Sequence, residues 1–305
     1  MDRERGNVNG LSVLMRPNVF MQLTMNGVAM GMIYALMAMG LILLIRAIGV
    51  MNFAQGDLLM LGAFITWSLT YQVKLPLPLM IPVAMLCFAM IGVIFMFLVY
   101  WPLRAASYPT ATVISTMGAA MAIREIATIT WGSLPLVSAP MVRGVLRVGS
   151  LRLQYQYLLT IVIGAVLIFM VFMLFEKLYV GKIMQAAAQN KYAAELLGIP
   201  TILTTAATYI IVVILASIGG FMIAPVFLVN VTLGSLQLRA FAGVVTGGFG
   251  SVKGAIVGSL IIGLVESYSS TFTTTYKDAV VFLVLIVVLL IRPQGIFGER
   301  IADKA

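Results

Sequence analysis

Histidine is absent from this chain, cysteine occurs once, and charged side chains make up only 10% of its 305 residues. Without histidine there is no His-based acid–base catalysis, no His-containing triad and no ordinary zinc site. The single cysteine, Cys87, has no second cysteine in the chain with which to form a disulfide. We therefore expect no catalytic residue, no bound metal and no cofactor in this chain.

The shortage of charge also indicates where the chain resides. Soluble domains average about 25% charged and 45–50% apolar residues, whereas this chain is 62% hydrophobic with a mean hydropathy of +1.09. So few charges cannot cover a surface that faces water on all sides. The long apolar runs, such as residues 280–291, do not alternate as β-barrel strands do. The sequence predicts an all-α, polytopic transmembrane helical bundle.

Spans of about 20 apolar residues are needed to cross the bilayer core, and the chain offers eight or nine candidates. We expect a polar N-terminal segment (1–18), one transmembrane domain (19–298) and a cytoplasmic tail (299–305). Residues 224–250 are apolar but interrupted by Pro225, Asn230, Gly234 and Arg239, which predicts a broken or tilted helix. The remaining candidate spans are 19–45, 58–71, 79–100, 111–130, 155–175, 202–223, 254–268 and 279–292.

The formal charge of +9 does not indicate nucleic-acid binding, because the basic residues are scattered singly near the ends of spans. Cytoplasmic loops of membrane proteins carry an excess of Lys and Arg. Placing 176–200 in the cytoplasm puts Arg104, Arg292 and the tail on the same side. The loop 131–154 is then periplasmic, although it carries three arginines, and the side of the N-terminus stays open.

A polar, alanine-rich stretch at 182–200 interrupts the apolar chain. Its residues are strong helix formers, Asn190 is placed to cap a second short helix, and Gly198 followed by Pro200 is a stop signal. The stretch is either a loop lying on the bilayer surface or a helix that docks on a protein. Membrane-surface helices usually carry bulky anchors and a basic face, so the small side chains here favour docking on a protein.

Polar groups inside membrane spans are costly and are candidates for function. Asn52, Gln55 and Asp57 lie where the first helical pattern breaks, and interrupted helices bind polar groups in many transporters. The alternative is that this segment is a surface loop. Glu266 lies within an apolar run, where it either lines a translocation path or pairs structurally with Arg239.

Small residues recur four positions apart in two spans, at Gly27 and Gly31 and at Gly254 and Gly258. Such spacing lets helix backbones approach closely in lipid. We expect helix packing within the chain at these glycines. The alternative is a contact with a second membrane subunit.

Five stretches of the chain, taken in order, form a recognisable set of motifs: "NGVAMGMIYALMAMGLILL" (26–44), "MNFAQGDLLMLGAF" (51–64), "GKIMQAAAQNKYAAELLGI" (181–199), "AFAGVVTGGFGSVKGAIVGSLIIGLVE" (240–266) and "YKDAVVFLVLIVVLLIRPQGIFG" (276–298). Together they resemble the permease subunits of branched-chain amino acid ABC transporters. They cover most of the chain from residue 26 onward and leave the N-terminus and 131–154 unmatched. Gln55 stands where the family often has histidine, and Tyr192 stands where the coupling motif E-A-A-x-x-x-G usually has glutamate.

The resemblance implies a bacterial inner-membrane permease subunit that translocates branched-chain or related hydrophobic amino acids. It implies as partners a second, homologous permease, two cytoplasmic ATPase subunits that use the ATP, and a periplasmic substrate-binding protein. The stretch 176–200 would then be the cytoplasmic coupling loop on which the ATPases act. The residues assigned to coupling in this way are Lys191, Tyr192, Ala193, Ala194 and Gly198.

Three other functions stay open on the sequence alone. Related permeases carry urea or short-chain amides, and the sequence does not choose between these and amino acids. An autonomous secondary transporter would need a coupling-ion site, for which paired carboxylates within spans are missing. A membrane scaffold without transport activity would also fit the extramembrane helix.

Overall fold

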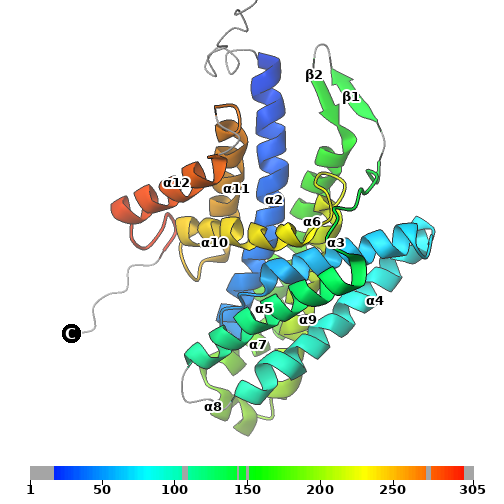
Figure 1. Cartoon of the computed structure of the whole chain (residues 1–305). Coiled ribbons are helices and arrows are strands. Elements are labelled where there is room, and N and C mark those ends of the chain that lie inside the picture. The colour runs from blue at the N-terminus through cyan, green and yellow to red at the C-terminus, as the bar shows by residue number, and fades with distance from the viewer. Residues whose placement is uncertain (1–16, 105–108, 143, 149–150, 273–275, 299–305) are drawn as a thin grey trace, which may run out of the picture.

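The computed structural model describes residues 17–104, 109–142, 144–148, 151–272 and 276–298, and over these ranges the chain is mainly helical (Figure 1). The N-terminal segment and the tail that the sequence predicts lie outside the described residues. The elements in chain order are α2 (Pro17–Ile48), α3 (Gln55–Tyr71), α4 (Leu77–Phe95), a π turn (Met96–Tyr100) and a 3₁₀ turn (Trp101–Leu103), α5 (Pro109–Trp131), β1 (Val145–Val148), β2 (Leu151–Gln154), α6 (Tyr155–Glu176), α7 (Tyr179–Gln189), α8 (Lys191–Leu196), α9 (Thr201–Ile223), η3 (Val231–Ser235), α10 (Leu236–Gly247), α11 (Val252–Ser269) and α12 (Lys277–Ile291).

Six helical segments within the described residues are long and apolar enough to cross a membrane. The predicted helical, polytopic architecture is therefore confirmed. Among the shorter helices of the described residues, α3 has 17 residues, α10 has 12 and α12 has 15. The figure of eight or nine crossings depends on these shorter helices and stays a prediction. The six long segments are Pro17–Ile48, Leu77–Leu103, Thr110–Trp131, Tyr155–Glu176, Thr201–Ile223 and Val252–Ser269.

Helix α2 forms the centre of the bundle. It has 32 residues, which at 1.5 Å per residue makes it about 48 Å long. Most residues of its most apolar stretch are buried inside the bundle. It contacts α11, α9, α6 and α10. In Figure 1, α2 and α11 lie side by side, whereas α10 crosses them. A 12-residue helix running across the bundle explains why 224–250 reads as an interrupted span.

The spaced glycines lie where α11 meets its neighbours. A Cβ atom on Gly27 would lie 2.9 Å from the Cα atom of Leu264, and one on Gly31 would lie equally close to the Cα atom of Leu260. A Cβ atom on Gly258 would lie 2.1 Å from the carbonyl oxygen of Gly243, and one on Gly254 would lie 2.4 Å from that of Gly247. At these positions helix backbones touch, so no larger side chain fits without moving a helix.

Helices α3, α4 and α5 run obliquely beside the central helices (Figure 1). Most residues in the apolar stretches of α4 and α5 are not buried inside the bundle. Leu86, Ile114 and Met121 are among the large apolar side chains that these two helices expose. In a membrane such faces contact lipid or another membrane subunit.

The loop 131–154 contains a short element of regular structure. Its second half forms an antiparallel hairpin in which Val145 pairs with Gln154 and Val148 with Leu151. The short runs "VLRV" and "LRLQ" alternate apolar and polar residues in part, which favours strands. The hairpin lies beside the N-terminal end of α2, and α8 lies at the other end of the bundle (Figure 1).

Candidate transport site

One glycine and one asparagine shape the turn at the break between α2 and α3. Gly49 has a φ of +74° just after the end of α2, a conformation that glycine adopts without steric cost. The Oδ1 atom of Asn52 accepts a hydrogen bond of 2.9 Å from the backbone N–H of Ala54. The chain can therefore turn tightly between the two helices.

Gln237, from α10, bridges the two sides of this break. Its Nε2 atom donates to the carbonyl oxygen of Asn52 at 3.2 Å, and its Oε1 atom accepts from the backbone N–H of Gly56 at 2.8 Å. Both ends of the amide are thereby satisfied by backbone groups that would otherwise be unpaired. Gln237 is not among the site residues predicted from the sequence, although a polar side chain in an apolar segment is a recognisable signal.

The predicted polar residues of the break are buried, so the surface-loop alternative is wrong. Asn52 and Gln55 have no exposed area and Asp57 is 2% exposed. Gln55 donates to the carbonyl oxygen of Val212 at 3.3 Å. Asp57 forms an ion pair of 3.1 Å with Arg124 of α5. These bonds tie the start of α3 to α9 and α5.

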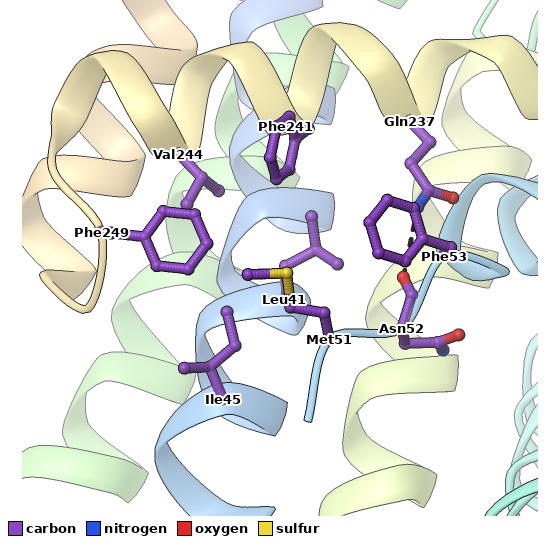
Figure 2. A pocket seen from close by; sticks show the side chains of 9 residues that line it. All are labelled: Leu41, Ile45, Met51, Asn52, Phe53, Gln237, Phe241, Val244 and Phe249. Carbon is purple, nitrogen blue, oxygen red and sulfur yellow. Dashed lines mark hydrogen bonds between the residues drawn. The ribbon is translucent and has the colours of Figure 1, made fainter. Parts of the chain in front are cut away.

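An apolar pocket adjoins the break (Figure 2). The rings of Phe53, Phe241 and Phe249 come from three segments and approach one another, with centroid distances of 6.4 Å and 6.3 Å for successive pairs. Asn52 and Gln237 lie together at one side of the pocket (Figure 2). The remaining lining residues are Leu41, Ile45, Met51 and Val244. The volume of the pocket is about 10 Å³, close to the space that a single water molecule requires, so in this conformation it holds no amino acid but places an apolar wall with a polar edge beside the break.

Glu266 belongs to a network of charges between α2, α10, α11 and α12. Tyr34 donates to its Oε2 atom at 2.5 Å, and Arg239 lies 3.3 Å and Lys277 3.4 Å from its Oε1 atom. Arg239 also donates to Asp278 at 2.6 Å. The contact of Arg239 with Glu266 agrees with the structural alternative raised from the sequence. Glu266 and Lys277 also line a pocket, so this carboxylate is both paired and part of the wall of a cavity, and its place on a translocation path stays a prediction.

The stretch 182–200 forms two short helices, as the sequence predicts. The Oδ1 atom of Asn190 accepts from the backbone N–H of Ala193 at 3.0 Å and caps α8, and Gly198 has a φ of +79°. Ala194 is buried, whereas Tyr192 is 73% and Leu197 82% exposed. The exposed surface of α8 is therefore carried by its large side chains.

The segment after α12 lies at the same end of the bundle as α7. The backbone N–H groups of Ile296 and Phe297 donate to the end of α10. Arg46, at the end of α2, donates to the carbonyl oxygen of Gly250 at 2.8 Å and to Glu176 at 2.6 Å. The end of α2 contacts α7 as well. The described residues after α12 and residues 179–198, which we call the α7–α8 segment, thus lie at the same end of the bundle.

Among the described residues, six helices of membrane-spanning length define a polytopic membrane protein, and the buried polar side chains at a broken helix are typical of transporters. Comparison with known proteins gives the family. Residues 23–289 match the family described as the branched-chain amino acid transport system / permease component, and the chain belongs to this family. It is a transport component rather than an enzyme, and a multi-pass protein of the bacterial inner membrane.

The chain is similar over nearly its whole length to several curated permeases. It is 29% identical to the high-affinity branched-chain amino acid transport system permease protein LivH of Salmonella typhimurium, over 93% of this chain and 97% of that one. LivH of Escherichia coli K12 is 28% identical with the same coverage. BraD of Pseudomonas aeruginosa is 29% identical over 93% of this chain and 98% of its own.

Proposed function

We propose that the chain is a membrane-spanning permease subunit of an ATP-driven ABC importer and that its substrates are branched-chain amino acids. The observation that carries this proposal is the family match over residues 23–289. The curated relatives with similar sequences are named for this class of substrate. The names of these relatives do not point to urea or short-chain amides as substrates. The transport test below includes urea as the alternative substrate.

The α7–α8 segment is proposed as the surface on which the ATPases act. Helix α7 is amphipathic, the left-handed Gly198 follows α8, and the exposed large side chains in and just after α8 are Tyr192, Leu196 and Leu197. Large apolar side chains on a short extramembrane helix are typical of a helix that enters a groove of a partner. In this arrangement Ala193 and Ala194 help to seat α8 on its own chain, and Lys191 and Tyr192 begin the helix.

The translocation path is proposed to run beside the break between α2 and α3. Asn52 reaches the apolar pocket (Figure 2). Gln55 and Asp57 act behind it by fixing the start of α3 through Val212 and Arg124. A wall of apolar groups with few dipoles suits conduction, which requires weak binding along the way.

The complete assembly is proposed to contain a second, homologous permease, two ATPases that use the ATP, and a periplasmic substrate-binding protein. The exposed apolar faces of α4 and α5 are available for lipid or for the second permease. The α7–α8 segment and the chain after α12 would be cytoplasmic and the β1–β2 hairpin periplasmic. Eight or nine crossings would then include the shorter helices α3, α10 and α12.

Sidedness can be tested with single cysteines in a Cys87→Ala background. Gln189→Cys and Gln294→Cys should resist an impermeant thiol reagent that is added outside intact cells, because both positions would face the cytoplasm. Leu134→Cys, in the exposed periplasmic loop, is the control that should react. Reaction at either of the first two positions would contradict the proposed orientation.

Transport is tested in proteoliposomes that contain both permeases and the ATPases, with ATP inside and binding protein outside. We expect uptake of leucine, isoleucine and valine that requires ATP and the binding protein. Leu197→Glu should assemble normally but lose ATP-driven uptake, because a charge replaces an exposed docking side chain. Uptake of urea instead of leucine would replace the substrate, and uptake without ATPases would identify a secondary transporter.

A further inference from the structure

A second pocket, separate from that of Figure 2, lies between α2, α6, α11 and the first residue of α12. In Figure 1, α2 lies between α6 and α11. The pocket has a volume of about 160 Å³, which is below the roughly 300–1,000 Å³ of sites for drug-sized ligands. Its walls combine Leu23, Met30 and Phe227 with the side chains of Glu266 and Lys277. It is therefore a small pocket with an apolar part and two opposite charges.

Glu266 has two partners away from the pocket and a third, more distant partner, Lys277, at the pocket. Tyr34 and Arg239 bind it from α2 and α10, and its side chain is 8% exposed. The Nζ atom of Lys277 lies 3.4 Å from the carboxylate, whereas charge-assisted N–H···O bonds are about 2.7–2.9 Å long. The Glu266–Lys277 pair is thus open enough for another cation to approach the carboxylate and for another anion to approach the ammonium group.

The network carries no net charge, because Glu266 and Asp278 balance Arg239 and Lys277. A buried ion pair gains little stability, since desolvation offsets the attraction between its charges. A ligand with one positive and one negative group can replace both halves of the Glu266–Lys277 contact without leaving a charge unpaired. A ligand with one charge of either sign replaces only one half of this contact. A cation leaves Lys277, which is 28% exposed, without Glu266. An anion leaves Glu266 with Arg239 and Tyr34 alone, so each gains less than a zwitterion.

We propose that this pocket binds the zwitterionic group of an amino acid, with Glu266 accepting from its ammonium group, Lys277 donating to its carboxylate, and the apolar wall receiving its side chain. The inference deepens the proposed function, on which it rests, by placing a substrate site in the half of the bundle nearer the β1–β2 hairpin. Glu266 is then a specificity-determining residue for amino acids over amides.

A thiol placed at the mouth of the pocket can report weak binding. Ser270→Cys, in a Cys87→Ala background, replaces an exposed lining residue, and Ser133→Cys is a matched exposed position in the loop 131–154. The intact transporter complex in proteoliposomes is treated with a thiol reagent from outside. Leucine should slow the reaction at position 270 several-fold and leave position 133 unchanged. Leucinamide, which lacks the carboxylate, and 4-methylpentanoate, which lacks the ammonium group, should protect neither position.

Charge-removing variants then test the two side chains. Glu266→Gln and Lys277→Met should each raise the leucine concentration for half-protection by about tenfold or more, the effect of losing one charged hydrogen bond. Lys277→Met changes a partly exposed side chain and keeps the assay valid where Glu266→Gln fails to fold. Lys253→Met, at the opposite end of α11, is the control that should leave protection unchanged.

The results separate this proposal from the proposed function. Leucine uptake without protection at position 270, or equal protection by leucinamide and 4-methylpentanoate, would overturn the pocket assignment and leave the permease function intact. Undiminished protection in Lys277→Met would overturn the role of Lys277 and with it the zwitterion site. Uptake of urea and not of leucine in the same vesicles would overturn both.

Discussion

Helix α11 and the α7–α8 segment are both rich in small residues, yet they use them in opposite ways. On α11, Gly254 and Gly258 bring the backbone against α10, and α2 presents Gly27 and Gly31 to the same helix. On α8 the small Ala194 is turned inward and the large Tyr192 and Leu197 are turned outward. In one region small residues permit contact within the chain, and in the other they leave the large side chains free for a partner.

The difference shows that a small-residue pattern does not itself identify an interface. Its meaning depends on what lies within reach of the missing side chain. Around Gly258 the nearest atoms are backbone atoms of α10, which cannot yield locally. Around Gly198 no atom lies within 4 Å, and the glycine is required by its φ of +79°. Substitutions should therefore fail for steric reasons in α11 and for conformational reasons after α8.

The largest effect should come from Gly258→Leu. A Cβ atom there would lie 2.1 Å from the carbonyl oxygen of Gly243, so α10 and α11 would have to separate. Overpacking of a filled interior costs about 1–3 kcal/mol and sometimes more, and backbone contact puts this site at the upper end. The variant should give little folded complex, as measured by detergent extraction and size-exclusion chromatography.

The same substitution at Gly118 of α5 is the matched control. No atom lies within 4 Å of a Cβ atom at that position, so Gly118→Leu should be recovered at the yield of the wild type. Normal recovery of Gly258→Leu would mean that α10 and α11 tolerate separation and that the comparison between the two regions is wrong.

The fold was predictable where one physical rule dominates. Long apolar runs require helices in lipid, and the predicted spans at 155–175 and 202–223 correspond to α6 and α9. The hairpin at 145–154 was not predicted, because its strands have four residues each and pair only with each other. The number of crossings could not be fixed, since the length of α10 does not tell whether it crosses or lies across the bundle.

Gly198→Val and Ala194→Trp should have an intermediate effect that is confined to coupling. A β-branched residue in the left-handed conformation costs about 1–2 kcal/mol, and a tryptophan at the buried Ala194 would push α8 away from its seat. Insertion and pairing with the second permease should stay intact, because α8 is distant from the glycine contacts of α11. Co-purification of the ATPases, or ATP-driven uptake at unchanged ATPase content, should be lost.

Gly198→Asn is the control for conformation, because asparagine tolerates the left-handed region. It should retain most of the uptake that Gly198→Val loses. Wild-type uptake by both Gly198→Val and Ala194→Trp would show that the α7–α8 segment is an ordinary loop, and the coupling role would have to be withdrawn.

The candidate site was predictable in its residue types but not in its contacts. Asn52, Gln55 and Asp57 stand out because polar groups are rare near apolar spans. Their partners Gln237, Val212 and Arg124 come from helices far away in the sequence. Nothing in the local sequence pairs these residues, because the pairing is set by how α10, α9 and α5 cross α3.

The last variant, Gln237→Leu, extends the comparison to a hydrogen bond between regions. The substitution introduces an apolar side chain of similar size and leaves the backbone N–H of Gly56 and the carbonyl oxygen of Asn52 without the Gln237 amide. An unsatisfied buried polar group costs about 1–3 kcal/mol, so the complex should assemble but melt at a lower temperature. Uptake should fall with it, because the break beside the pocket of Figure 2 is no longer held.

Thermal unfolding of the purified complex and initial uptake rates measure the two effects, with Gln72→Leu at the exposed end of α3 as the control. An unchanged melting temperature with normal uptake would show that the amide bridge does not support the site.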